Sequence, residues 1–224
     1  METLLNDLLP LMIASAIVPL WIILTLLLLR GEGGVAKASA FVGGAFVVRL
    51  AQGIVFGLIL GAARDATGES RTSAITSTLV LVVGVLLLIA AYKKWSKEED
   101  PDAPPPKWMT ALNTVTPLKT FGMGMLLLLV GAKSWVFTLS AIAVIREAQL
   151  GMAGGVLAYL VFAIAAQSLI LAPIIAAAAA PAQSAKLLDT VLGWLERNNR
   201  VITIAASLIF GVWFVWKGIA GLLG

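Results

Sequence analysis

Six long apolar stretches run along the chain, separated by shorter polar segments. The hydrocarbon core of a bilayer is about 30 Å thick, and a helix of about 20 apolar residues crosses it. Because no water reaches that depth to pair with open N–H and C=O groups, each stretch should be helical. The pattern therefore predicts six transmembrane helices, at about residues 5–29, 38–63, 73–92, 119–144, 152–176 and 200–222.

Two of the connecting segments have a character of their own. Residues 93–118 have a basic start, an acidic middle and a run of prolines, which predicts a flexible or partly extended cytoplasmic linker. Within residues 184–197 one helical face is apolar and the other largely polar, which predicts an interfacial helix lying on the membrane. The apolar face consists of Leu187, Leu188, Val191, Leu192 and Leu195.

The linker divides the predicted helices three and three, which suggests a duplication. Two halves with an odd number of helices must insert in opposite senses, as in many transporters. The sequence AIVPLW at 16–21 can be laid on GAKSWV at 131–136, although chance produces such short matches easily. We expect an all-α membrane protein of six transmembrane helices in one domain, built as two inverted three-helix repeats at about 1–92 and 119–224.

Composition agrees with a protein surrounded by lipid. Mean hydropathy is +0.98, and only 12% of residues are charged. A globular domain carries about twice that charged fraction, so a soluble particle of this length would lack polar cover. No Lys or Arg precedes the first apolar stretch, as a secretory signal peptide would require, so we expect that stretch to remain in the mature protein.

The absence of Cys and His excludes several kinds of chemistry. Disulfides, thiolate or imidazole metal sites and every catalytic triad that uses His or Cys are ruled out. The remaining nucleophiles have no base arranged near them, so we expect no enzyme activity, no cofactor and no metal site. The net charge of +4 lies in the loops, which favours the membrane surface over nucleic acid as a partner.

The distribution of basic residues predicts the orientation. Ten Lys and Arg residues lie on the side of the loops that follow the first, third and fifth helices, against four on the other side. The richer side should face the cytoplasm. We therefore expect a multi-pass protein of the plasma membrane with both termini outside.

Two cations inside apolar helices are the strongest functional signal. Arg49 and Lys133 each lie near the middle of a predicted helix, whereas no Asp or Glu lies inside any of them. A charge at that depth costs at least roughly 2.5–3.5 kcal/mol unless it faces protein, water or a partner charge. An anionic ligand near the midplane would supply the missing charge, and the lack of carboxylates argues against a divalent-cation exporter. The alternatives are that either cation only locks helices together through backbone carbonyls, or reaches an interface.

Glycines in the second helix indicate which way Arg49 points. Arg49, Gly53, Gly57 and Gly61 recur every four residues and form one stripe, which favours close packing of helices. That packing would turn Arg49 into the bundle with Gln52 beside it. The same stripe could instead support a homodimer.

Interruptions in both halves point to a site at the midplane. Gly131 to Ser134 is a small, polar weak point in the fourth helix, and Gln167 with Pro173 makes a comparable break in the fifth. For Gln167 an interhelical hydrogen bond is the alternative. We predict breaks or gates at Pro19, Gly131 and Pro173, and substrate contacts from Arg49, Gln52, Lys133, Ser134 and Gln167.

Two long segments carry a resemblance to a known family. PPPKWMTALNTVTPLKTFGMGMLLLLVGAKSWVFTLSAIAVI at 104–145 and DTVLGWLERNNRVITIAASLIFGVWFVWKGIAGL at 189–222 resemble the peptidoglycolipid-addressing (GAP) family of the LysE superfamily. The VPLW and FVGG segments fit as well. The resemblance implies six helices in two inverted repeats and transport across the plasma membrane. It implies cell-envelope glycolipid, such as glycopeptidolipid or sulfolipid, as cargo, whereas the wider superfamily carries amino acids, other small solutes or cations.

One element departs from that family. Its members commonly have an Asn-Pro-Lys-Asn-like motif in the fourth helix, and here the motif reads Gly131-Ala132-Lys133-Ser134. The resemblance therefore keeps Lys133 as a candidate and puts in doubt any role that needs the amide or the proline kink.

Three functions compete at this point. The first is a transporter or flippase-like exporter of an anionic lipid, glycolipid or lipid-like solute, held by Arg49 and Lys133. The second is a LysE-type exporter of small, amino-acid-like solutes. The third is a non-transporting accessory subunit of a lipid-export complex, which would dock through residues 93–118 and 184–197. The expected partners are membrane lipids, the substrate, and a second copy or other subunits of such a complex.

Overall fold

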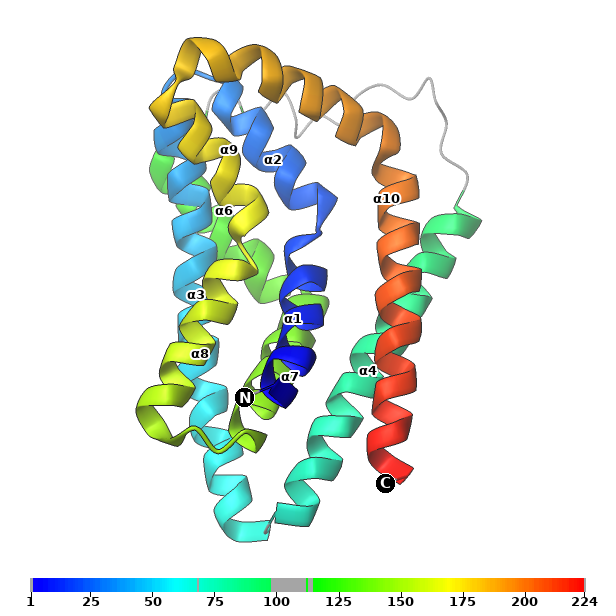
Figure 1. Cartoon of the computed structure of the whole chain (residues 1–224). Helices are drawn as coiled ribbons and strands as arrows, with labels where there is room; N and C mark the ends of the chain where they lie inside the picture. The colour runs from blue at the N-terminus through cyan, green and yellow to red at the C-terminus, as the bar shows by residue number, and fades with distance from the viewer. Residues whose placement is uncertain (1, 68, 98–111, 113–114, 224) are drawn as a thin grey trace.

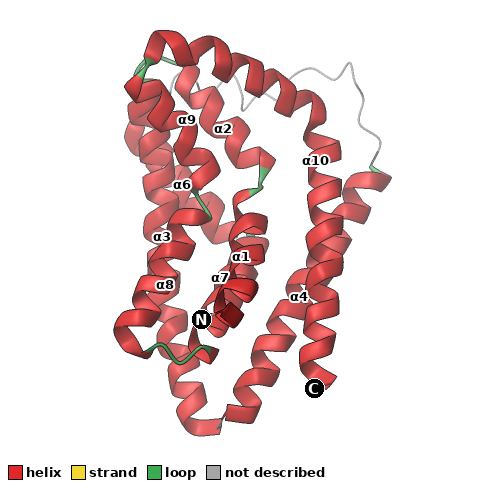
Figure 2. Ribbon diagram, viewed as in Figure 1, coloured by secondary structure: helices red, strands yellow, loops and turns green. Residues whose placement is uncertain are grey.

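The structure is a computed structural model that describes residues 2–67, 69–97, 112 and 115–223; of residues 2–3, 60–67, 69–73, 132–133 and 182–183 it describes the backbone alone. In this part of the chain helices are joined by short loops, and no strand occurs (Figure 2). The helices are α1 (Glu2–Ala16), α2 (Pro19–Arg30), α3 (Gly34–Thr67), α4 (Glu69–Ser96), α6 (Pro117–Val130), α7 (Ala132–Glu147), α8 (Gly151–Ala165), α9 (Ser168–Ala179) and α10 (Pro181–Leu223) (Figure 1).

These helices make spans of two kinds. Helices α3, α4 and α10 are each long and apolar enough to cross a membrane alone. The pairs α1/α2, α6/α7 and α8/α9 reach that length only together, and they are bent by 50°, 71° and 64°. Figure 1 shows both termini at the same end of the bundle, as six crossings would require. The all-helical, multi-pass membrane fold is thus confirmed, with three unbroken spans and up to six if each bent pair is one span.

The first two breaks have simple local causes. Pro19 lacks an N–H group and opens α2, and the residue before it, Val18, is extended at φ −121° and ψ 95°. Gly131 separates α6 from α7 with φ −71° and ψ 88°, outside the helical region.

The third break is not where the proline predicts it. Pro173 lies inside α9, and the chain turns at Ala166 and Gln167 instead. The break predicted from Gln167 with Pro173 is therefore present at Gln167, whereas Pro173 itself does not interrupt the helix and its gating role stays a prediction. A membrane helix tolerates a proline where its surroundings satisfy the freed backbone group. Pro10 is likewise contained within α1.

Glycines allow the closest helix packing. A Cβ added to Gly84 of α4 would lie 2.6 Å from the backbone nitrogen of Val215 in α10, so only glycine fits there. Gly44 of α3 and Gly124 of α6 oppose each other in the same way, since a Cβ on either would collide with a backbone carbonyl of the other helix. These contacts hold α4 against α10 and α3 against α6.

Helix α10 caps one end of the bundle and then descends along its side. Figure 1 shows its first part crossing the upper end, where Leu192 and Leu195 pack on Ile23 and Leu26 of α2. The segment 184–197 is helical and continuous with the last span. Its apolar face is therefore partly covered by α2, and its place on a membrane surface stays a prediction.

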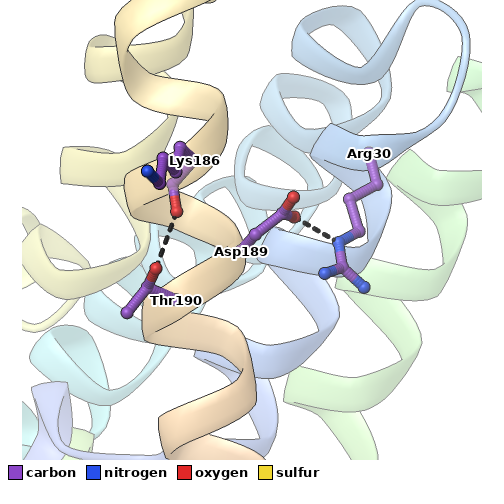
Figure 3. Close-up of polar contacts among 4 residues, drawn as sticks. All are labelled: Arg30, Lys186, Asp189 and Thr190. Atoms are coloured by element: carbon purple, nitrogen blue, oxygen red, sulfur yellow. Dashed lines mark hydrogen bonds and ion pairs between the residues drawn. The ribbon is translucent and has the colours of Figure 1, made fainter.

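One ion pair joins α10 to the end of α2 at this upper end. Arg30 Nε donates to Asp189 Oδ1 at 2.6 Å, and Lys186 and Thr190 flank the carboxylate along the helix (Figure 3). Thr190 Oγ1 donates to the Lys186 carbonyl oxygen at 2.8 Å. At the other end of the bundle, Lys217 of α10 pairs with Asp7 of α1.

Most of the predicted linker lies outside the described residues. Of residues 93–118, the structure places the first few in the last turn of α4 and the last two in α6. Leu112 is buried in a cluster with Leu28 and Phe41, so this one residue packs on the bundle.

Candidate functional site

A small cavity lies where the three bent spans break. Ser15 and Val18 contribute from the α1/α2 break, Ser134 from the α6/α7 break and Gln167 from the α8/α9 break, and Arg49 of α3 completes the polar lining. The cavity has a volume of about 20 Å³, which is room for roughly one water molecule. Three separate interruptions of the helices thus converge on one arginine.

Arg49 is almost fully enclosed at this junction. Its side chain is 4% exposed, and its Nη1 donates to Ser15 Oγ at 3.3 Å. The guanidinium carbon lies 5.6 Å from the centre of the Phe162 ring, a cation–π distance. Its Nε has no hydrogen-bond partner, and no carboxylate among the described residues pairs with it. Among the described residues, the arginine therefore keeps an unused donor and has no opposite charge beside it.

Gln167 leaves further polar atoms unpaired in the same place. It is 3% exposed, and neither its Nε2 nor its Oε1 has a hydrogen-bond partner in the described part of the protein. A buried polar group left without a partner costs roughly 1–3 kcal/mol. Because Gln167 lines the cavity, a water molecule or ligand atom there could take up both of its bonds.

Gln52 is buried and unpaired as well, but it is not part of the cavity. Its amide atoms have no partner among the described residues, and its side chain is 5% exposed. The residues that line the cavity do not include it. Its predicted role as a substrate contact stays a prediction.

The predicted motif around Lys133 is only partly placed. Lys133 lies in the first turn of α7, but its side chain falls outside the described part of the structure. Ser134 lines the cavity, and its backbone N–H donates to the Gly131 carbonyl oxygen at 2.8 Å. Trp135 Nε1 reaches back across the break to the Leu129 carbonyl oxygen at 2.7 Å. A shared cavity for Arg49 and Lys133 stays a prediction.

The surroundings of Arg49 include residues that sequence reasoning missed. Tyr159 of α8 donates its hydroxyl to the Arg49 carbonyl oxygen at 2.5 Å, and its ring lies 6.0 Å from that of Phe162. Ser15 could have been noticed as a hydroxyl four residues before Pro19 in an apolar helix. Phe162 carries no such signal, because an aromatic residue in an apolar helix is ordinary.

A second, larger space opens beside this site. A groove of about 750 Å³ runs between α3, α7 and α8, and its lining is mostly apolar. Gly53 and Gly57 of α3 line the groove, and so does Tyr159 of α8. Arg146 also lines the groove and donates through Nη2 to the Gly57 carbonyl oxygen.

The cavity at Arg49 is suited to an anion and not to a metal ion. The side chains that line it carry a guanidinium, a primary amide, two hydroxyls and the indole of Trp21. In the described part of the chain, no three His, Cys, Asp or Glu side chains lie together as a metal site would need. Positive charge, free N–H donors and low exposure together favour a negatively charged group.

Comparison with known proteins identifies the family. A family model described as "Sap, sulfolipid-1-addressing protein" matches residues 8–220. The chain is a member of the Sap family. This match confirms the resemblance to glycolipid-addressing proteins, while membership of the wider LysE superfamily stays a prediction. Comparisons with curated proteins and with solved structures found no match.

The Sap match covers the whole candidate site. It includes the breaks of all three bent spans, α3 with Arg49, and α8 with Tyr159 and Phe162. The family description names the addressing of a sulfolipid, and together with the apolar helices it indicates a membrane protein involved in lipid export. The charged, closed cavity thus lies within the matched part of the chain.

Proposed function

We propose that this Sap-family protein is a flippase-like exporter that moves an anionic lipid, glycolipid or lipid-like solute across the plasma membrane. Its head group would bind near the midplane at the junction of the three broken spans. The observation that carries the proposal is Arg49, a buried cation with an unused donor and no carboxylate partner among the described residues.

The positive charge of the site determines which class of head group would bind. A buried cation is stabilised by an opposite charge and destabilised by a like one. A sulfate, phosphate or carboxylate would accept hydrogen bonds from the guanidinium, the Gln167 amide and the Ser134 hydroxyl. The family is named after a sulfolipid, so a sulfated glycolipid is the substrate that we put first.

Transport would require the breaks to move. A cavity of about 20 Å³ cannot hold a sugar sulfate, so a bound head group needs more room than the structure provides. Broken helices are used in this way by transporters, in which half-helices shift around a midplane site. The inverted repeat is also part of this proposal: the break between α1 and α2 would correspond to the break between α6 and α7.

The orientation belongs to the same proposal. Arg30 and Lys186 lie at the upper end of Figure 1, as do the basic residues at the end of α4, so that end would face the cytoplasm. Both termini would then lie outside. Lipid entering from the cytoplasmic leaflet would leave on the side where α7 meets α8.

A reconstituted system tests this proposal. Purified protein is placed in phosphatidylcholine vesicles that contain a fluorescent sulfated galactolipid, and the fraction of probe that becomes accessible to an external quencher is followed over time. We expect wild type to equalise the probe between leaflets faster than protein-free vesicles do. Arg49→Met should abolish most of that acceleration, whereas Arg30→Met, which removes an arginine from the surface, should keep it.

The other functions give different outcomes. The small size of the cavity favours a LysE-type exporter of small solutes as the second candidate. Efflux of an amino acid from the same vesicles, with no movement of the sulfated lipid, would support that candidate and overturn ours. Absence of both activities from the purified protein, together with a stoichiometric partner in a native preparation, would favour an accessory subunit.

A further inference from the structure

The groove between α3, α7 and α8 is distinct from the cavity at Arg49, and of the residues that line it none lines that cavity. It lies along the glycine stripe of α3, one turn beyond Arg49 and on the side of the loop that joins α7 to α8. Its volume of about 750 Å³ falls in the range in which protein pockets bind small amphiphiles. A space of this size within the membrane-spanning part of a protein does not stay empty and takes up lipid or another ligand.

The lining of the groove favours a hydrocarbon chain. Ile54 and Leu58 of α3 face Val156 and Leu160 of α8 across glycines that offer no side chain. Ile54, Leu58 and Val156 are 66%, 69% and 55% exposed, so this apolar surface is open to its surroundings and not sealed in a core. Lipid from the bilayer can therefore enter from the side.

The polar groups of the groove give the sign of the amphiphile. Arg146 and Gln149 line the end beside the α7–α8 loop, and the described lining includes no Asp or Glu. A neutral or cationic amphiphile would gain nothing from the arginine. The chain of an anionic lipid would fit the apolar groove, and the charge of the lipid would be attracted by Arg146.

Tyr159 contacts both the groove and Arg49. Its ring lies against Gly53, because a Cβ on that glycine would collide with the ring. Its hydroxyl donates to the Arg49 carbonyl oxygen, and its ring lies next to that of Phe162. The Phe162 ring in turn contacts the Arg49 guanidinium. One side chain thus contacts the groove, the backbone of Arg49 and the aromatic partner of Arg49.

From this arrangement we infer that the groove holds an acyl chain of the transported anionic lipid, with Tyr159 as the partition between the tail in the groove and the head group at Arg49. The inference rests on the proposed function, because it takes the same lipid as cargo. It adds a second binding region, made by α3, α7 and α8, and a residue that positions the two regions.

Photo-cross-linking tests the groove without relying on transport. The probe is phosphatidylglycerol with a diazirine in one acyl chain, in phosphatidylcholine vesicles that contain the protein. After irradiation and digestion, we expect saturable cross-links at Ile54, Met152 and Val156, which unlabelled phosphatidylglycerol competes away. The zwitterionic lipid with the same diazirine chain should label these positions less.

Two glycines provide a matched pair of variants. A Cβ at Gly57 meets nothing within 4 Å, and Gly57 lines the groove, so Gly57→Phe should fill the groove without disturbing the helix. Gly122 of α6 is equally open but lies outside the groove, so Gly122→Phe is the control. We expect groove cross-links to fall about tenfold in Gly57→Phe, the effect of a steric cost of about 1.4 kcal/mol, and to stay at the wild-type level in Gly122→Phe.

The possible outcomes separate this inference from the proposed function. If Gly57→Phe does not elute as a folded protein, Val156→Phe fills the same groove from the opposite wall. Labelling that is spread evenly over the exposed helix faces, or that neither variant changes, would overturn the inference even if the sulfated lipid is transported. Groove-specific labelling without any transport would support the lipid site and count against the proposed function alone.

Discussion

The two sides of this bundle are built on opposite plans. Helices α4 and α10 are unbroken over their spans, and they pack closely because Gly84, Gly211 and Gly218 offer no side chains at their contact. The three spans around Arg49 are each bent by 50° or more, and polar atoms of Arg49 and Gln167 remain without partners there. Figure 1 shows the straight pair along one flank and the bent spans beside it.

The difference separates stability from function. An unbroken membrane helix satisfies its own backbone groups and needs only close packing. A broken span with unpaired buried polar atoms is costly, and such costs persist at sites where a ligand or a movement uses them. We conclude that α4 and α10 stabilise the fold, whereas the bent spans, together with Arg49 on the unbroken α3, form the site.

The largest effect is expected from a change in the straight pair. Gly84→Leu places a side chain where a Cβ already lies 2.6 Å from the Val215 nitrogen, and this backbone atom cannot move aside cheaply. Overpacking of this kind costs about 1–3 kcal/mol, and we expect the upper end of that range. The melting temperature in detergent, followed by size-exclusion chromatography after heating, measures it.

Gly122→Leu is the control for this substitution. A Cβ at Gly122 meets nothing within 4 Å, so the variant should melt close to wild type. Equal melting temperatures for Gly84→Leu and wild type would show that the α4–α10 contact is not close, against the account.

The next effect is expected at Arg49, with the opposite pattern. Arg49→Met removes a buried cation whose burial costs roughly 2.5–3.5 kcal/mol, so its melting temperature should equal or exceed that of wild type. Its transport of the sulfated lipid should fall about 10- to 100-fold, the loss given by hydrogen bonds to a charged group worth about 1.5–3 kcal/mol. If Arg49→Met is less stable than wild type but transports the lipid equally fast, Arg49 has a structural role only.

A smaller effect is expected at Gln167. Gln167→Leu removes two unpaired buried amide atoms, so the protein should become more stable by about 1–3 kcal/mol. Transport should slow severalfold, because a neutral hydrogen bond contributes about 0.5–1.5 kcal/mol. Gln52→Leu removes a similar unpaired amide outside the cavity, so it should also stabilise the protein; a loss of transport equal to that of Gln167→Leu would support the predicted substrate contact of Gln52.

The smallest effect is expected at the upper end of the bundle. Arg30 and Asp189 form an ion pair whose side chains are 51% and 55% exposed. Such pairs contribute about 0–1 kcal/mol and are screened by salt. Asp189→Asn should lower the melting temperature slightly at low salt, less at high salt, and leave transport unchanged. A large loss of transport would instead make α10 a moving part of the site.

Much of the fold follows from the sequence because lipid leaves few choices. Hydrocarbon forces each apolar stretch to be helical, so the spans are predictable from length and hydropathy alone. The break before Pro19 is predictable from the missing N–H group. A break near Gln167 and Pro173 is predictable as well, but its position is not, because Ala166 and Gln167 have no strong preference against a helix and Pro173 stays within α9.

Only those site residues that stand out individually in the sequence could be predicted. Arg49 stands out because a charge inside an apolar helix is costly wherever the helix packs. Its partners Ser15, Tyr159 and Phe162 come from two other spans, and their approach depends on helix packing that sequence periodicity does not specify. The groove has the same origin, since three helices form it together.

The central claim is that the charge of Arg49 selects the lipid head group, and a selectivity ratio tests it most directly. The rate of equalisation is measured for a fluorescent sulfated galactolipid and for its unsulfated counterpart, in vesicles with wild type, Arg49→Lys or Arg49→Met. We predict that wild type prefers the sulfated lipid, that Arg49→Lys keeps part of the preference, and that Arg49→Met loses it. An unchanged ratio in Arg49→Met would contradict the claim.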